Sequence, residues 1–360
     1  MAQFSMEIMR LTGSVLRENQ QITKNEKNRF CPPDDMQLFI SSAFTHIGMP
    51  TGDADFMADV IIASELSGHE CHGVRRFPEY ISRAKEGFCN PSAKLKIEKD
   101  SGVIIVADGQ RAYGNIVMRD ATDIAIARAK QHGVAIIAVK GCDSGGRLAD
   151  YCERAADVGV VTMFFANESG GGQQVSPPGG IEARMSTNPL AFGIPRAAKP
   201  HLVLDMSTST VAFGRLSETI DRGEQPPAEW VNSVGVLRHF GGHKGFGLAI
   251  VVEALAGALT GGGTANENPE TEDQAFLLIS FDVEHFRGLN EFTAELERFL
   301  CHVKDVTLEE GAKNIRIPGE GSLDGNNRMD PRGILLRPIV FQRIRQAMRG
   351  MPIRFPTSLQ

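Results

Sequence analysis

Apolar positions along the chain recur with two different periods, one typical of helices and one typical of strands. Leu38, Phe39, Phe44 and Ile47 follow Asp34 and Asp35 at helical spacing, which predicts a capped helix. The same reasoning predicts helices over residues 53–66, 119–131, 149–158, 245–259 and 289–303. Short β-rich runs predict strands over 95–106, 134–139, 160–166, 202–206 and 276–281. This alternation is typical of an α/β protein.

Composition narrows the class of protein. The chain has 360 residues, of which 42% are hydrophobic and 23% charged, so a substantial buried core is expected. A net charge of -6 argues against a nucleic-acid partner. No apolar run reaches membrane-spanning length. The first residues mix basic and acidic side chains without the apolar stretch of a signal peptide, so we expect a cytoplasmic protein.

The six cysteines are scattered and form no C-x-x-C pair, which favours reduced thiols over disulfides. His69, Cys71 and His72 stand close together, as metal ligands do. However, no second cluster at zinc spacing accompanies them, so we expect no metal site. The chain also lacks G-x-G-x-x-G between a strand and a helix, and it lacks G-x-x-x-x-G-K-[ST]. The sequence therefore shows neither a Rossmann fingerprint nor a P-loop.

One segment combines groups suited to acid–base chemistry on an acid. His72 can exchange a proton near neutral pH. Arg76 would share a face with it if the segment were helical, and its planar fork matches a carboxylate. Tyr80, four residues further on, could donate another hydrogen bond. A surface loop with a structural histidine would have the same spacing.

Three further segments place polar groups on backbone shaped by glycine or proline. Asn188 belongs to Ser186-Thr187-Asn188-Pro189, which could bind phosphate or merely close a turn. The strand at 202–206 ends in Asp205 and continues into Ser207, Thr208 and Ser209. Gly242-His243-Lys244-Gly245 precedes the long helix, where the helix N-terminus and Lys244 would favour a phosphate. Gly245 would let the backbone approach a ligand closely, although an ordinary helix start is an equal reading.

At these residues the chain resembles the type-2 malate/L-lactate dehydrogenase family, which includes L-sulfolactate dehydrogenases. The resemblance runs from about Leu38 to Met348. Six motifs in family order carry it: His72-Gly73 with Arg76 and Tyr80, Pro178-Gly179-Gly180, 186–191, 205–209, 242–247 and Pro318-Gly319-Glu320.

The resemblance implies a non-Rossmann α/β (α+β) fold with a largely antiparallel or mixed sheet flanked by helices. It also implies a homodimer that uses NAD or NADP to interconvert a small 2-hydroxy acid and a 2-oxo acid. It divides the chain into a polar extension (1–34), a helical substrate and dimerisation domain (35–150 with 325–360) and a cofactor domain (151–324).

The resemblance assigns roles residue by residue. His72 matches the acid–base histidine, and Arg76 matches the arginine that holds the substrate carboxylate. The cofactor contacts match Ser207 to Ser209, His243 with Lys244, and Gly319 with Glu320.

The sequence departs from the family pattern in three places. Cys71 stands where a serine usually precedes His-Gly, and Ser144 stands where a second histidine is common. The connection from Trp230 to the Gly-Gly-His-Lys motif is short. If Ser144 and that connection line the site, the pocket should be wider and less basic. The departures leave open a non-redox member of the fold, such as a pseudoenzyme or lyase, and a reductase of cyclic imino acids.

Overall fold

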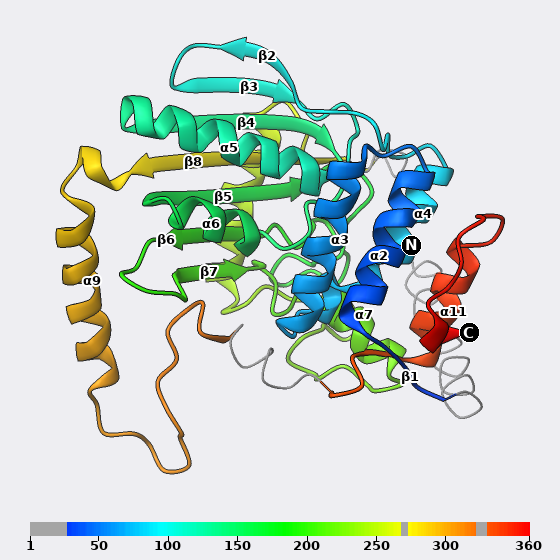
Figure 1. The fold of residues 1–360 in the computed structure, drawn as a ribbon. Coiled ribbons are helices and arrows are strands. Elements are labelled where there is room, and N and C mark those ends of the chain that lie inside the picture. The colour runs from blue at the N-terminus through cyan, green and yellow to red at the C-terminus, as the bar shows by residue number, and fades with distance from the viewer. Residues whose placement is uncertain (1–26, 268–272, 322–329) are drawn as a thin grey trace.

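The computed structural model describes residues 27–267, 273–321 and 330–360. Its centre is a seven-stranded sheet in the order β2-β3-β4-β8-β5-β6-β7 (Figure 1). The strands are β2 (Lys96–Asp100), β3 (Ile104–Asp108), β4 (Val134–Cys142), β5 (Val160–Glu168), β6 (Leu190–Ile194), β7 (Leu202–Met206) and β8 (Gln274–Asp282). β3 and β4 are parallel, and the other neighbouring pairs are antiparallel. The expected mixed, largely antiparallel sheet is confirmed.

Helices cover both faces of this sheet. α5 (Gly114–His132) and α6 (Ala149–Ala156) pack on one face, as Figure 1 shows. On the other face, α8 (His243–Val252) continues into a π-helix, η3 (Glu253–Ala258). β4 contributes side chains to the hydrophobic cores on both faces of the sheet. Ile137 and Val139 belong to the core beneath α5 and α6, and Ala138 belongs to the core beneath α8 and η3. A strand that is covered on both faces has a continuous run of apolar residues, and such a run predicted this strand from the sequence.

α5 lies close to the sheet because small side chains face it. Ala121, Ala125 and Ala129 follow one another at four-residue spacing and are fully buried. Gly133 ends the helix in the left-handed conformation, with φ 84°, and its N–H donates to the carbonyl of Ala129 at 2.7 Å.

A helical layer packs beside the sheet around its own aromatic core. It contains α2 (Pro33–His46), α3 (Thr51–Leu66), α4 (Phe77–Lys85) and α11 (Pro338–Ala347). Phe44 contacts the rings of Phe77, Tyr80 and Tyr113 within this core. A two-stranded antiparallel sheet of β1 (Arg29–Cys31) and β9 (Ile334–Leu336) joins the two ends of the described chain. The remaining helices are α7 (Phe213–Asp221), α9 (Leu289–Lys304) and the 3₁₀ turns η1 (Glu70–His72), η2 (Val74–Arg76), η4 (Val283–His285) and η5 (Thr357–Leu359).

The structure corrects several boundaries. The single strand expected over 95–106 is a hairpin, because Gly102 turns the chain between β2 and β3. α5 begins five residues before the expected start at Arg119. Leu38 is 68% exposed although it has helical spacing with buried neighbours. The end of the predicted polar extension (1–34) is part of the core, since Cys31 is fully buried in β1; residues 1–26 lie outside the described chain.

The central sheet crosses the expected boundary between domains. β2, β3 and β4 come from 35–150, and β5 to β8 come from 151–324. β4 and β8 pair along most of their length. One continuous sheet therefore contains strands from both proposed units.

Close backbone packing fixes the start of α8. The carbonyl of Thr208 accepts a hydrogen bond from the N–H of Phe240 at 3.2 Å, and the carbonyl of Phe240 accepts one from the N–H of Gly245 at 3.0 Å. A Cβ at Gly245 would lie 2.6 Å from the carbonyl oxygen of Thr208 and 2.5 Å from that of Phe240. Gly245 is thus needed for packing, whatever it does toward a ligand.

Substituting Gly245→Ala should therefore destabilise the fold by about 1–3 kcal/mol, because the clash is with backbone that must shift. Gly247→Ala, two residues along α8, is the matched control, because a Cβ at that position would meet open space. The control should be neutral or stabilising by about 0.5–1 kcal/mol, the helix preference of alanine over glycine. Denaturant unfolding of both variants measures the difference. Equal stabilities would contradict the packing role of Gly245.

Candidate active site

His72 lies in a broken turn, not in a continuous helix. The 3₁₀ turns η1 and η2 meet at Gly73, and α4 begins only at Phe77. The condition under which His72 and Arg76 would share one face, a continuous helix, is therefore not met. The turn takes this shape because Glu65 of α3 lies directly behind it. The Glu65 carboxylate accepts a hydrogen bond from the N–H of Val74 at 2.9 Å, and a Cβ at Gly73 would lie 2.1 Å from it.

Ion pairs hold the same turn from two other helices. Arg75 of η2 and Arg343 of α11 both pair with the buried Asp221 of α7, at 2.5 and 2.8 Å. Glu70 of η1 pairs with Arg337, next to the start of α11. Segments far apart in the sequence thus fix the position of His72.

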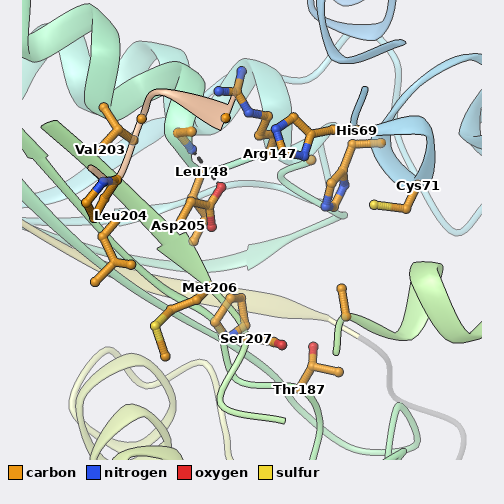
Figure 2. A pocket seen from close by; sticks show the side chains of 18 of the residues that line it. His69, Cys71, Arg147, Leu148, Thr187, Val203, Leu204, Asp205, Met206 and Ser207 are labelled. Atoms are coloured by element: carbon orange, nitrogen blue, oxygen red, sulfur yellow. Dashed lines mark hydrogen bonds between the residues drawn. The ribbon is translucent and has the colours of Figure 1, made fainter. Parts of the chain in front are cut away.

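His72 borders a cavity of about 530 Å³ that β7 and the following residues line on the opposite side. Figure 2 shows Met206 and Ser207 on one wall and His69 and Cys71 on another. Thr187 and Gly319 also line it. The expected site residues His72, Cys71, Asp205, Ser207 and Gly319 are therefore brought together around one space.

A second, smaller chamber of about 110 Å³ lies against His72, and Ser144 lines it. The loop that carries Ser144 rests on the first turn of α5. A Cβ at Gly114 would lie 2.1 Å from the carbonyl oxygen of Asp143, so only glycine permits this contact. Ser144, which stands where a second histidine is common in the family, thus lines the same chamber as His72.

Burial and positive neighbours keep the His72 imidazole neutral. Nδ1 is buried and has no hydrogen-bond partner within the described chain. Desolvation lowers the pKa of His72 to about 3, and the charge of Arg76 is the next cause, followed by His69 and Arg147. Nε2 is then the nitrogen left to contact a ligand, and it carries a free lone pair whenever Nδ1 holds the proton.

Arg76 and Tyr80 pack against each other. The Arg76 guanidinium pairs with Glu79 at 2.6 Å and lies over the Tyr80 ring. Burial raises the pKa of the Tyr80 hydroxyl, and the charge of Arg76 and the hydroxyl of Ser144 partly offset this effect. Tyr80 is buried in the aromatic core and Arg76 lines a separate cavity of about 580 Å³, so neither side chain lines the two spaces beside His72.

Two cationic groups of the larger cavity were not predicted from the sequence as site residues. Arg147 is buried and pairs with Asp150 and Glu153, at 2.6 and 2.9 Å. Arg316 also lines the cavity. Arg147 directly follows Gly145 and Gly146 in the segment that carries Ser144, and Arg316 stands just before Pro318-Gly319. Nothing in either segment marks the arginine as a site residue, and the fold brings both to the cavity beside His72.

Asp205 occupies the N-terminus of α6. Its carboxylate accepts a hydrogen bond from the N–H of Ala149 at 2.9 Å, marked by the dashed line in Figure 2. Burial nevertheless raises the pKa of Asp205, an effect that its hydrogen bonds from the backbone of Ala149 and Leu148 and the charge of Arg147 only partly offset. A helix N-terminus of this kind favours a negative group, and here the protein's own carboxylate supplies it.

Some of the expected cofactor residues have internal partners. Thr208 donates to the carbonyl of Thr187, and Ser209 donates to that of Val211. The side-chain amide of the buried Asn188, with φ 39°, donates to Ala249 and Glu253. Glu320 contacts Lys304 and the N–H of Ile317. His243 and Lys244 are exposed at the start of α8, outside both spaces. A cofactor role for these residues stays a prediction.

The short connection after Trp230 does not line either space beside His72. It is a compact turn built on the buried Asn232, whose Oδ1 accepts the N–H groups of Val234 and Val236, both at 3.0 Å. The idea that this connection widens the site is therefore not supported by its position.

The described residues lack the features of two wider classes of protein. Among them, His, Cys, Asp and Glu nowhere gather in threes as a metal ion would require. Nor does any described helix combine the length and apolar character needed to cross a membrane.

Comparison with known proteins places the chain in a family. The family model for malate/L-lactate dehydrogenase matches residues 31–345. The chain is 32% identical over 340 residues to hydroxycarboxylate dehydrogenase B of Escherichia coli strain K12, covering 88% of this chain and 93% of that protein. It is 30% identical over 314 residues to a malate dehydrogenase of Pyrococcus abyssi, covering 80% of this chain and 86% of that protein. The solved sulfolactate dehydrogenase of Methanocaldococcus jannaschii superposes with a TM-score of 0.80 at 28% identity, over 91% of this chain and 98% of that chain.

The fold is that of the non-Rossmann class of malate and lactate dehydrogenases. The chain belongs to the malate/L-lactate dehydrogenase family. The family expected from the sequence motifs is thus confirmed, and with it the expected reaction class, oxidoreduction between 2-hydroxy and 2-oxo acids. Nothing in the comparisons favours the non-redox alternative.

The carboxyl of Glu65, which anchors the His72 turn, should make stability depend on pH. Burial and the charge of Glu70 raise its pKa to about 8 from an ordinary 4.5. The pKa of Glu65 is higher in the folded protein than in the unfolded chain. The contribution of this carboxyl to stability is therefore complete below its pKa in the unfolded chain, about 4.5, and is lost as the pH rises through about 8. Glu65→Gln keeps an acceptor for Val74 but cannot ionise.

We therefore expect wild type and Glu65→Gln to have similar unfolding free energies at about pH 5, and the variant to be the more stable at about pH 9. Urea unfolding at both pH values measures this. A difference that stays constant across the range would mean that Glu65 does not titrate in the folded protein.

Proposed function

We propose that this protein is an NAD- or NADP-dependent dehydrogenase that interconverts a 2-hydroxy acid and a 2-oxo acid at His72. The observation that carries the proposal is a neutral imidazole with a sealed Nδ1 that borders both a large cavity and a small chamber. Such a group can take the hydroxyl proton of the substrate during oxidation and return it during reduction. The nicotinamide supplies the hydride acceptor or donor.

The larger cavity fits a nicotinamide dinucleotide. Its volume of about 530 Å³ lies within the range of ligand pockets. Leu204 and Met206 offer apolar walls for a ring, Ser207 and Thr187 offer hydroxyls, and Arg316 offers positive charge for a phosphate. A neighbouring cavity of about 670 Å³ shares His69, Arg316 and Gly321 with it, which suits an elongated ligand. Calorimetric titration with NADH and NADPH decides which of the two binds.

Arg76 is our choice for the group that holds the substrate carboxylate, since its charge acts on His72. Its side chain lines the neighbouring cavity of about 580 Å³, so it would turn from that cavity toward His72 to bind the acid. Its carboxylate partner, Glu79, is close to half exposed, so exchanging that pair for a substrate costs only about 0–1 kcal/mol. Arg147 lines the cavity, but the side chains of Asp150 and Glu153 already pair with it. A carboxylate beside Arg76 would also offset the charge that lowers the pKa of His72, so binding of the acid favours proton uptake by the imidazole.

The protein is further proposed to act as a homodimer in the cytoplasm. The outward face of α8 and η3 is apolar and exposed at Leu248, Ile250, Val251 and Leu259. A contiguous apolar face of this kind fits a second copy of the same chain. All six cysteines are free thiols, in keeping with a reducing compartment.

Replacing His72 should abolish most of the proton transfer. His72→Ala is expected to lower kcat by about 10²- to 10⁴-fold for reduction of a 2-oxo acid. Affinity for NADH or NADPH should stay near the wild-type value, because the cofactor contacts lie mainly along β7. Absorbance of the nicotinamide measures the rate and calorimetry the affinity. Turnover near wild type in a variant that binds cofactor would remove His72 from the mechanism.

Arg76→Lys and Arg147→Lys test the carboxylate assignment side by side. Losing the planar fork should cost about 1.5–3 kcal/mol, so Arg76→Lys should raise KM for the acid by about 10- to 100-fold. Arg147→Lys should change KM much less while lowering the midpoint of thermal unfolding. The opposite pattern would assign the substrate carboxylate to Arg147.

A charge on the apolar face should separate the dimer. Ile250 is 49% exposed, and Ile250→Lys would remove its burial from both copies. Two losses of about 1.5 kcal/mol raise Kd by roughly 100-fold. Leu38→Lys on α2 is the control, since it places the same charge on another exposed apolar position. Sedimentation of both variants gives the oligomeric state, and an unchanged dimer in Ile250→Lys would place the interface elsewhere.

A further inference from the structure

The helical segment that begins near Gly245 is apolar along its length except at one residue. Between residues 245 and 259 the only charged side chain is that of Glu253, and this residue is 8% exposed. It stands at the first position of the π-helix η3, a rare geometry that is often found at functional sites. A carboxylate buried in such surroundings is unfavourable unless hydrogen bonds satisfy it. The partners of Glu253 therefore indicate what the residue does.

Two asparagines donate to the Glu253 carboxylate. The side-chain amide of Asn188 donates to Oε1 at 3.0 Å, and that of Asn167 donates to Oε2 at 3.1 Å. Each amide nitrogen has a second acceptor, which is the carbonyl of Ala249 for Asn188, at 3.2 Å, and that of Gly263 for Asn167, at 2.9 Å. Two acceptors fix which side of an amide carries its nitrogen. Glu253 thus helps to set the orientation of both side chains.

The network is closely packed, yet two of its atoms have no partner. A Cβ at Gly257 of η3 would lie 2.6 Å from Nδ2 of Asn167, so glycine is needed for this contact. The Oδ1 atoms of Asn167 and Asn188 are buried and have no hydrogen-bond partner within the described chain. Each buried acceptor without a partner costs about 1–3 kcal/mol. Such a cost is more readily explained by a role in the site than by stability alone.

Both asparagines belong to the walls beside His72. Asn167, in β5, lines the small chamber itself. Asn188 stands between Thr187 and Pro189, and both of these residues line the chamber as well as the larger cavity. The residues that the two spaces share therefore include His72 and the backbone on either side of Asn188.

The turn at Asn188 also supports the wall of the larger cavity. Asn188 has a left-handed φ of 39°, which asparagine adopts more readily than most residues. The carbonyl of Thr187 accepts hydrogen bonds from the N–H and the hydroxyl of Thr208, each at 2.9 Å. Ser207, the residue before Thr208, lines the larger cavity together with Thr187 (Figure 2). Movement of Asn188 would therefore displace the wall that separates the two spaces.

We propose that Glu253 is a positioning residue for hydride transfer, because through Asn188 and Asn167 it fixes the wall against which the nicotinamide and the acid meet beside His72. The inference rests on the proposed function and adds a residue that lines neither space. During reduction the carbonyl carbon of the 2-oxo acid receives a hydride from the reduced nicotinamide, and its oxygen receives a proton at His72. The reacting atoms must lie about 3–3.5 Å apart, and a misplacement of about 1 Å costs up to about 100-fold in rate.

Glu253→Gln replaces one acceptor oxygen with an N–H donor, so one of the two asparagine amides loses its partner while the size of the side chain is kept. We expect kcat for the best of pyruvate, oxaloacetate and 2-oxoglutarate to fall by about 10- to 100-fold, while Kd for NADH or NADPH stays within about threefold of wild type. Absorbance of the nicotinamide gives kcat, and calorimetry gives Kd. A loss of stability alone would not separate the two constants.

Asp282→Asn is the matched control. Asp282 is 3% exposed and pairs with Lys130 and His285, but it stands at the opposite end of β8 from Gln274, which lines the chamber. Removing this buried carboxylate should lower the midpoint of thermal unfolding and leave kcat unchanged below that midpoint.

A double-mutant cycle tests the route through Asn188. Asn188→Gly removes the amide while the backbone can still adopt a positive φ, so it should lower kcat by a factor similar to that of Glu253→Gln. In the Glu253→Gln background the same change should lower kcat by less than about threefold, because the contact is already broken. Fully additive losses would contradict this route, and with it the proposal.

Hydrogen exchange of the Thr208 amide gives a readout that does not need turnover, since its N–H donates to Thr187. It should exchange at least about 10-fold faster in Glu253→Gln than in Asp282→Asn. Wild-type kcat in Glu253→Gln, or an equal loss of kcat in Asp282→Asn, would overturn the positioning role while the proposed function stands. If wild type reduces no 2-oxo acid with either cofactor, the proposed function fails. Thr208 exchange then decides alone, and an equal rate in the two variants would overturn the role of Glu253.

Discussion

The desolvation of one imidazole is the constraint on which the site depends. His72 is neutral because its Nδ1 is sealed inside the protein and because Arg76 adds positive charge beside it. A neutral imidazole can accept a proton from a hydroxyl. Its pKa is too low to retain that proton unless the carboxylate of a bound substrate offsets the nearby positive charge. In the proposed mechanism, substrate binding and proton transfer are coupled through electrostatics, without the need for a second titrating group at Ser144.

The turn that holds His72 is stabilised by groups distant in sequence. Glu65 supports it from behind, and Asp221 joins Arg75 and Arg343 at its side. Such networks are destabilised strongly when one partner is removed, because a buried charge is then left alone. A cluster of buried carboxylates and arginines thus fixes the position of the turn that carries His72, the proposed catalytic residue.

Much of this could be predicted from the sequence. Periodicity located the main helices and most strands, because amphipathic and fully buried segments have distinct spacings. Motif order identified the family and drew attention to Ser144, which the structure shows lining the same chamber as His72. The 3₁₀ break at Gly73 was not predictable, because the carboxylate that demands glycine there comes from Glu65, a residue of another helix. Arg147 was missed for a related reason: it follows Gly145-Gly146 in the segment that carries Ser144, but nothing in that segment marks it as a site residue, and the tertiary fold brings it to the cavity beside His72.

The state of the His72 imidazole is the central claim, and it can be observed directly. Nuclear magnetic resonance titration of ¹⁵N-labelled histidine, with His72→Ala to assign the signal, reports its protonation in the free protein. We predict that His72 stays neutral as the pH falls well below 6.5, toward a pKa of about 3, and that its pKa rises when a 2-hydroxy acid is bound together with cofactor. A free-protein pKa near 6.5 that does not move on binding would contradict this claim.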